Sequence, residues 1–155
     1  MDELKERIRA DLGDAMRARD QARLRALRMA LTSITNAEVS GDSARELSDD
    51  EVVKILTREA KKRREAAEAF DSVGRPEQAA AERAEGEVLA EYLPAQLADD
   101  ELATLVAAAI AEVGADGMPA AGPAMGRVMK TVTPRVAGRA DGARVAAEVR
   151  RQLAG

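Results

Sequence analysis

The sequence predicts an all-α protein, an N-terminal four-helix part followed by a small C-terminal three-helix bundle. The 155 residues are rich in the strong helix formers Ala, Arg, Glu and Leu, and they include one Phe, one Tyr and no Trp. Apolar residues recur at the 3.6-residue period of a helix, and no alternating strand pattern competes with them. The core is therefore expected to consist of close-packed helices joined through Leu, Val, Ile, Met and Ala.

Apolar spacing places the first two helices. The first runs from about Asp2 to Arg17, and Gly13 weakens it. Its apolar positions are Leu4, Ile8, Leu12 and Ala15. Asp20 is placed as the N-cap of a second, longer helix that runs toward Val39. Its apolar positions are Leu24, Leu27, Leu31 and Ile34.

The third helix has the clearest start signal in the chain. Ser48 as N-cap and Glu51 three residues later form a capping box, and Leu47 with Val52 matches a hydrophobic staple. Gly74 is placed as the C-terminal cap of this helix. The predicted buried side holds Val52, Ile55, Leu56, Ala66, Ala67 and Phe70.

Glu59 and Arg63 fall on that same side of the third helix, four residues apart. The spacing favours an intrahelical pair at the margin of the core. The alternatives are a buried charged pair held by a partner helix and a functional carboxylate, and burying either charge alone would cost several kcal/mol. Lys54, Lys61, Lys62 and Arg64 point to other faces, where solvated charges are favoured over RNA contacts.

Pro76 opens the fourth helix, and Pro94 ends it. The boundary between the two parts is placed within Leu93–Leu97, because a proline after an apolar cluster makes a short, stiff linker. The predicted domains are therefore residues 1–94 and 95–155. Tyr92, beside this boundary, is interpreted as packing between the parts, with base stacking as the alternative.

Three helices are expected after the boundary. The fifth runs from Asp99 to about Val113 and ends at Gly114. The sixth begins at Pro123, and Pro134 is predicted to end it. Its apolar stripe is Met125, Val128, Met129 and Val132, with Arg127 and Lys130 on the opposite side.

Gly138 is placed as the left-handed cap that follows the sixth helix. The seventh helix starts at Asp141, with Arg144 and Arg151 together on the side that faces away from its apolar positions. Those apolar positions are Val145, Val149 and Leu153.

The chain contains no Cys and no His. Disulfides, thiolate nucleophiles, imidazole bases and the common zinc sites are therefore excluded. No Walker-type loop and no Gly-x-Gly-x-x-Gly motif occurs either. We expect no catalytic residues, no metal site and no cofactor. The N-terminus lacks a signal-peptide pattern and no stretch is apolar enough to cross a membrane, so a soluble, cytoplasmic protein is expected.

The net charge of −4 is unevenly distributed along the chain. Residues 122–155 hold seven basic residues against Asp141 and Glu148, a balance of +5, so the preceding residues sum to −9. This pattern suggests a basic patch on one domain of an acidic protein, which is compatible with a defined polyanion. The candidate contacts are Arg127, Lys130, Arg135, Arg139, Arg144 and Arg151.

Several motifs give the chain a family resemblance. They are Met125–Lys130, Gly138–Gly142 with Val145, Tyr92–Leu97 and Lys61–Glu65. With them the chain resembles the YqeY-like proteins nearly from end to end. Its last third is similar to the tail domain of the B subunit of aspartyl/glutamyl-tRNA amidotransferases, although members tend to carry Lys where this chain has Arg.

The resemblance implies a function that residues alone do not establish. In the amidotransferase the tail domain holds the elbow of a tRNA, and YqeY-like domains also occur attached to glutaminyl-tRNA synthetases. A non-catalytic, tRNA-binding accessory protein of transamidation is therefore expected; the family's label as a carbon-nitrogen ligase with glutamine as amido-N-donor comes through that association. The alternatives are an adaptor that docks on an aminoacyl-tRNA synthetase or amidotransferase, and a stand-alone enzyme of unknown chemistry.

Overall fold

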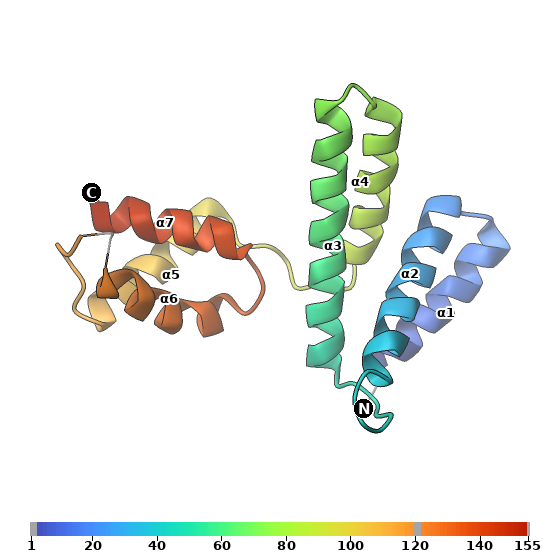
Figure 1. Ribbon diagram of the computed structural model, residues 1–155, viewed down its shortest axis with the longest axis horizontal. Helices are drawn as coiled ribbons and strands as arrows, with labels where there is room; N and C mark the ends of the chain where they lie inside the picture. Colours follow the sequence, from blue (N-terminus) through green and yellow to red (C-terminus); the bar gives the residue numbers. More distant parts are fainter. Residues whose placement is uncertain (1–2, 120–121, 155) are drawn as a thin grey trace. The chain divides into compact units, whose positions relative to one another are not determined.

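A computed structural model describes residues 3–119 and 122–154, and within those ranges it contains seven α-helices and no strand. The helices are α1 (Glu3–Ala18), α2 (Gln21–Glu38), α3 (Asp49–Ser72), α4 (Pro76–Ala90), α5 (Asp99–Glu112), α6 (Pro123–Val136) and α7 (Gly142–Ala154). The predicted all-α class is confirmed. The chain forms two compact units, Met1–Leu93 with α1 to α4 and Pro94–Gly155 with α5 to α7 (Figure 1).

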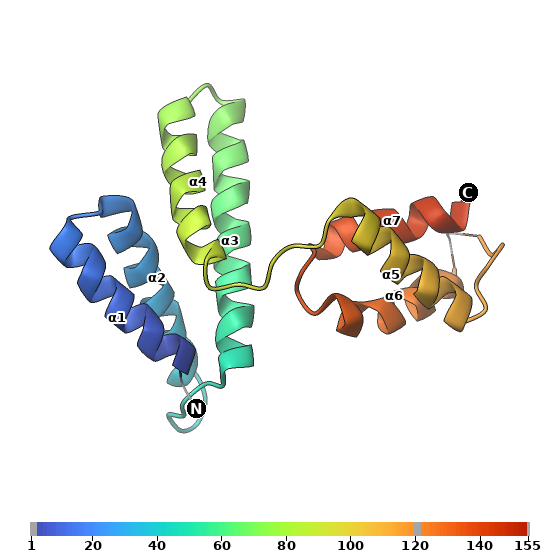
Figure 2. The same ribbon diagram turned by 180° about the vertical axis from the view of Figure 1, so that it is seen from behind.

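In the first unit α1 lies beside α2, and α3 lies beside α4 (Figures 1 and 2). Helix α2 also packs against both α3 and α4, and α1 contacts α3. These contacts bury most of the predicted apolar stripes, but Phe70 and Ala66 of the predicted buried side of α3 are only half-buried. The largest fully buried side chains of this unit are Ile8, Leu27, Ile34, Val52, Leu56 and Leu89.

Tyr92 belongs to the core of the first unit, so its predicted role in packing between the parts is wrong. Its ring is only 6% exposed and lies in the same apolar cluster as Ile8 and Leu89. The guanidinium of Arg7 lies 4.7 Å from the ring centroid, and the hydroxyl donates a hydrogen bond to Asp11. Burial and this hydrogen bond raise the pKa of the Tyr92 hydroxyl. A ring enclosed in this way is not available to stack on a base.

The start of α3 confirms the predicted capping box. The Ser48 hydroxyl accepts a hydrogen bond from the Glu51 N–H at 3.2 Å, and the Glu51 carboxylate accepts one from the Ser48 N–H at 3.2 Å. Leu47 and Val52, the two members of the predicted staple, are both buried in the core of the first unit. One orphan N–H group of the first turn, that of Glu51, is thus satisfied locally, as is the N–H of Ser48 itself.

Replacing Ser48 with alanine should lower the free energy of unfolding of the first unit by about 0.5–2 kcal/mol, because the cap acceptor is lost. Chemical denaturation of the full chain, followed by circular dichroism, measures this change. Ser43→Ala, in the exposed turn before α3, is the matched control and should leave the midpoint unchanged. An unchanged denaturation midpoint for Ser48→Ala would show that the capping box does not stabilise the first unit.

Glycine ends α3 and α5 in the same way. Gly74 has a φ of 73°, and the bonds from Arg75 N–H to the Phe70 carbonyl and from Gly74 N–H to the Asp71 carbonyl form a Schellman motif. Gly114, with a φ of 67°, follows α5 in the same arrangement. Both stops were predicted from the sequence.

The end of α6 differs from the prediction. Pro134 lies inside the helix, which continues to Val136, and the left-handed cap is Ala137 with a φ of 51°. Pro134 is exposed and removes only the bond to the Lys130 carbonyl, which can bond to solvent instead, so the last turn survives. Gly138 also has a positive φ of 77°, so the turn continues left-handed for two residues.

The second unit has one core of small and β-branched side chains. Val106, Val128, Val132 and Val149 are completely buried, and Met125 and Met129 cover the edge of this cluster. Asp141 precedes α7 as predicted, and its carboxylate accepts a hydrogen bond from the Ala143 N–H at 3.0 Å. Within the described ranges, none of the helices is long and apolar enough to span a bilayer.

Candidate nucleic-acid interface

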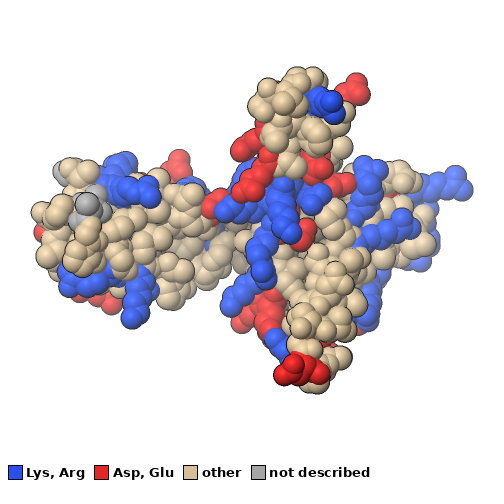
Figure 3. All heavy atoms as spheres, viewed as in Figure 1, with Lys and Arg blue, Asp and Glu red and all other residues tan. Residues whose placement is uncertain are grey.

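The six basic residues predicted to contact an anion come from α6, from the turn after it and from α7. On the face shown in Figure 3, the basic side chains of the second unit lie in separate places, some beside acidic ones. The six residues differ in the hydrogen bonds and ion pairs that they form within the protein. Their partners divide them into three groups.

Arg127 and Lys130 form the first group, on the outer face of α6. Both are exposed, and they stand one turn apart on the side of the helix opposite the buried Val128 and Val132. The guanidinium of Arg127 lies 3.6 Å from the Met118 sulfur, which is a weak acceptor, and Lys130 has no ion pair among the described residues. These two side chains are therefore cations without a carboxylate partner.

Arg139 forms the second group and ties two segments of the unit together. Its Nε donates to the Ala95 carbonyl at 2.8 Å, and its own carbonyl accepts from the Leu97 N–H at 2.8 Å. The side chain is half-buried. Arg139 thus holds the segment before α5 against the turn between α6 and α7, and only part of its guanidinium remains for an anion.

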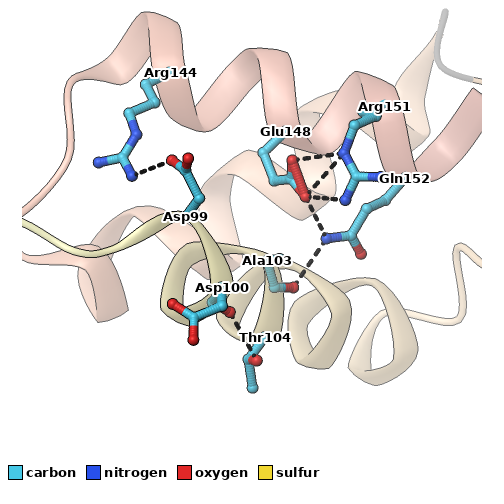
Figure 4. A network of polar contacts seen from close by, with 8 residues as sticks. All are labelled: Asp99, Asp100, Ala103, Thr104, Arg144, Glu148, Arg151 and Gln152. Atoms are coloured by element: carbon cyan, nitrogen blue, oxygen red, sulfur yellow. Dashed lines mark hydrogen bonds and ion pairs between the residues drawn. The ribbon is translucent and has the colours of Figure 1, made fainter.

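Arg135, Arg144 and Arg151 form the third group, in which each guanidinium is paired with a carboxylate. Arg135 pairs with Glu112 of α5. Arg144 pairs with Asp99 at 2.7 Å, and Arg151 pairs with Glu148 in its own helix (Figure 4).

Arg144 and Arg151 line a groove between α5 and α7 of about 510 Å³. Asp99, Asp100 and Glu148 line the same groove, so its walls carry both signs of charge.

Within this groove, Glu148 accepts hydrogen bonds from two neighbours in its own helix, Arg151 and Gln152. Hydrogen bonds from Arg151 and Gln152 and the charge of Arg151 lower the pKa of Glu148 to about 2, and Gln152 also donates to the Ala103 carbonyl of α5 at 2.9 Å (Figure 4). A carboxylate whose pKa is depressed on folding stabilises the fold above its unfolded pKa, near 4.5, and loses that effect as the pH falls toward 2.

Glu148→Gln should therefore lower the thermal stability of the second unit at pH 7, and the difference from the parent chain should shrink below about pH 4.5 and vanish near pH 2. Melting temperatures of both chains measured from pH 7 to pH 2 give this comparison. A difference that stays constant across the range would mean that the charge of Glu148 does not stabilise the fold.

The structure corrects the predicted division of charge. The acidic residues of α5 and its flanking loops belong to the same unit as the basic residues of α6 and α7, and residues 94–155 hold seven basic and seven acidic side chains. The second unit is therefore neutral overall, and the net charge of −4 lies in residues 1–93. The local excess of +5 near the C-terminus is offset by partners such as Glu112 and Asp99.

Glu59 and Arg63 form the predicted intrahelical pair, but Glu59 is buried and not at the margin of the core, and partner helices hold the pair. Glu59 is 7% exposed, and its carboxylate lies 3.8 Å from the Arg63 guanidinium. Helix α4 supplies two more carboxylates to Arg63, Glu82 at 3.2 Å and Glu85 at 3.7 Å.

Helix α2 completes this network. Arg25 pairs with the buried Glu85 at 2.8 Å, and the Ser33 hydroxyl donates to Glu59 at 3.2 Å. The network therefore joins three helices through the guanidinium groups of Arg63 and Arg25 and the Ser33 hydroxyl. The partners from α4 and α2 could not be predicted from the sequence, because they lie far from Arg63 along the chain.

A second buried pair was missed entirely. Lys5 of α1 lies 2.6 Å from Glu38 at the end of α2, and both side chains are buried. The hydrogen bond from Lys5 lowers the pKa of Glu38. The two residues are 33 positions apart, and no local pattern marks either one as buried.

The fold and these sites define an all-helical protein of two compact units in which many charged side chains pair with one another, while Arg127 and Lys130 have no carboxylate partner among the described residues. Among the described residues, no group of three or more carboxylates is placed to hold a metal ion. The chain belongs to the YqeY-like protein family, because a sequence model of that family matches residues 5–153. No curated protein matches the sequence.

Proposed function

We propose that this chain is a non-catalytic, tRNA-binding accessory protein of tRNA-dependent transamidation, and that the outer face of α6 contacts the tRNA backbone. The observation that carries the proposal is the exposed pair Arg127 and Lys130, two cations one turn apart that have no carboxylate partner in the part of the chain that the structure describes. Such a pair can reach neighbouring phosphates, and phosphate contacts supply most of the affinity of proteins for nucleic acid.

The chemistry of the surface favours backbone contacts over base recognition. Single-stranded RNA is usually held by exposed aromatic rings, and the only Tyr of this chain is buried in the first unit. A folded RNA presents phosphates at fixed spacing instead. The rigid outer face of α6, anchored by buried Val128 and Val132, suits that target.

The affinity should be modest. The second unit is neutral overall, and Arg135, Arg144 and Arg151 already bind carboxylates. In the proposal, Arg127 and Lys130 make the main contacts, Arg139 contributes the free part of its guanidinium, and the three paired arginines contribute little. The chain belongs to the YqeY-like family, and the resemblance of its last third to an amidotransferase tail, inferred from its sequence motifs, supports tRNA as the polyanion.

The remaining parts of the proposal follow from this role. The three-helix bundle of residues 95–155 supplies the RNA contact, the four-helix part of residues 1–94 supports it, and the protein works in the cytoplasm without cofactor or metal. The isolated chain has no glutamine-dependent ligase or amidase activity of its own; any link to carbon-nitrogen ligase chemistry is through a partner enzyme.

An adaptor function is the second candidate, and one observation favours it. The groove between α5 and α7 is lined by both Arg and Asp or Glu side chains, a mixed surface that suits a protein partner better than a polyanion. In that case the chain would dock on an aminoacyl-tRNA synthetase or an amidotransferase and bind free tRNA weakly or not at all.

Binding of the purified chain to total tRNA, compared with single-stranded RNA and duplex DNA at one fixed salt concentration, tests the proposal. The expected result is measurable binding to tRNA and weaker binding to the other two. Equal binding to all three would indicate non-specific attraction. Absence of tRNA binding, together with binding to a synthetase or an amidotransferase, would favour the adaptor.

A further inference from the structure

We infer that the groove between α2 and α3 in the first unit is a binding site for a single phosphate group. The groove has a volume of about 260 Å³ and is lined by Ser33, Asn36, Ala37, Ile55, Arg58, Glu59 and Lys62. Pockets for drug-sized ligands usually measure about 300–1,000 Å³, so this one suits one small polar group. The inference concerns a different unit from the proposed tRNA contact and does not depend on it.

Two cations of α3 stand on one wall of the groove. Arg58 and Lys62 are four residues apart, which places them on the same side of the helix, and both are exposed. Arg58 has no ion pair or hydrogen bond among the described residues, so all of its guanidinium donors remain free.

Helix α2 supplies the opposite wall. Asn36 offers its side-chain amide and has no side-chain partner in the described part of the chain. The hydroxyl of Ser33, one turn earlier, already donates a hydrogen bond to Glu59. The available donors are therefore the Arg58 guanidinium, the Lys62 ammonium and the Asn36 amide, which surround the groove from two helices.

Among the described residues, Glu59 is the only carboxylate that lines the groove, and neighbouring cations of the protein offset its charge. Its carboxylate accepts from Ser33 at 3.2 Å and from Lys62 at 3.4 Å, and it lies 3.8 Å from the Arg63 guanidinium. The contact with Lys62 is long and uses one of three ammonium protons, which leaves the others for an anion.

The charge balance of the groove therefore favours an anion. Its lining carries two positive charges and one negative charge, and the negative charge is also held by Arg63 from outside the lining. An oxyanion with several acceptor oxygens matches three donor groups that line one groove, and Arg binds phosphate through paired N–H groups. A phosphate group, from a free phosphate ester or from an RNA backbone, is the ligand that these donors fit.

The test uses the full chain and amide chemical shifts in two-dimensional NMR. Inorganic phosphate, a nucleoside 5′-monophosphate and a short oligoribonucleotide without terminal phosphate are titrated separately at constant ionic strength. Saturable shifts of the amides around Ser33, Asn36 and Arg58 are expected with at least one of them. Saturation by the first two alone identifies a phosphate-ester site, and tighter saturation by the oligoribonucleotide identifies a backbone site.

Two variants separate the groove from general electrostatics. Arg58→Gln should weaken binding about tenfold or more, as expected for the loss of a charge-assisted contact, and its lack of partners means that folding is not at risk. Lys54→Gln removes the same charge from an exposed position of α3 outside the groove, and it should change binding less than about twofold.

Either of two results would overturn the inference. One is the absence of saturable shifts at the groove with all three titrants. The other is an equal loss of binding in Arg58→Gln and Lys54→Gln, because that outcome would mean that the anion responds only to the overall charge of α3.

Discussion

Replacing Arg63 with alanine should lower the free energy of unfolding of the first unit by about 3–5 kcal/mol. The guanidinium lies within 4 Å of three carboxylates, Glu59, Glu82 and Glu85, and its side chain is only 19% exposed. Without it, three negative charges would face one another between α3 and α4, and Glu85 would keep only Arg25. Removing one partner of a buried pair is far more costly than removing the whole pair.

Urea denaturation of the full chain measures the change, with Lys54→Ala as the control from an exposed position of the same helix. That control should shift the free energy of unfolding by less than about 0.5 kcal/mol. Arg63→Met keeps much of the side-chain volume without the charge, so it separates lost packing from lost pairing. If Arg63→Ala costs no more than the Lys54 control, the network does not hold the three helices together.

Replacing Leu102 with alanine should lower the free energy of unfolding of the second unit by about 2–5 kcal/mol. Leu102 is 2% exposed and packs in a core that contains no aromatic ring. Its neighbours in that core are largely Val and Ala, and β-branched side chains have little freedom to turn into a new cavity. The loss of unfolding free energy should therefore fall in the upper half of the 2–5 kcal/mol range, at about 3.5–5 kcal/mol.

Thr104→Ala, two residues later on the exposed side of α5, is the matched control for this measurement. The Thr104 hydroxyl bonds only to the Asp100 carbonyl of its own helix, so its loss should be nearly neutral. A loss below about 1 kcal/mol for Leu102→Ala would contradict a tightly packed core in the second unit.

Features that depend on neighbouring residues could be predicted from the sequence. The capping box at Ser48 and the glycine stops at Gly74 and Gly114 each involve residues within six positions, and all three are confirmed. The amphipathic stripes of α6 and α7 are of the same kind. Their period alone fixes which side chains face a core.

Features that join distant segments could not be predicted. The partners of Arg63 on α4, the Lys5–Glu38 pair and the Tyr92–Asp11 hydrogen bond link residues 19 to 81 positions apart. A charged residue at such a position looks the same in the sequence as one in solvent. Only helix packing decides which of them becomes buried.

The charge of the C-terminal stretch shows the same limit. Residues 122–155 carry an excess charge of +5. In the folded chain, however, Arg144 and Arg135 form ion pairs with Asp99 and Glu112 of helix α5. Pairing, which is a property of the fold, reduces six candidate contacts to Arg127, Lys130 and part of Arg139. These unpaired cations are the basis of the proposed tRNA contact.

The salt dependence of tRNA binding by two matched double variants tests that proposal most directly. Arg127→Ala/Lys130→Ala removes two unpaired charges, and Arg135→Ala/Arg151→Ala removes two charges that already bind carboxylates. Both change the net charge by the same amount, so any difference between them reports contact with phosphate. Arg139 is left in place because it also holds the chain at Ala95.

Each phosphate contact contributes about −0.7 to −0.9 to the slope of log affinity against log salt. We expect the Arg127/Lys130 variant to bind tRNA more weakly, with a slope shallower by about 1.4–1.8, and the Arg135/Arg151 variant to keep nearly the parent slope. The Arg127/Lys130 variant should retain the parent melting temperature within about 2 °C. The Arg135/Arg151 variant should melt at a lower temperature, because Glu148 loses the hydrogen bonds from Arg151, so binding is compared well below both melting temperatures. Equal slopes for the two variants, or no salt-dependent binding of tRNA by the parent chain, would contradict the proposed interface.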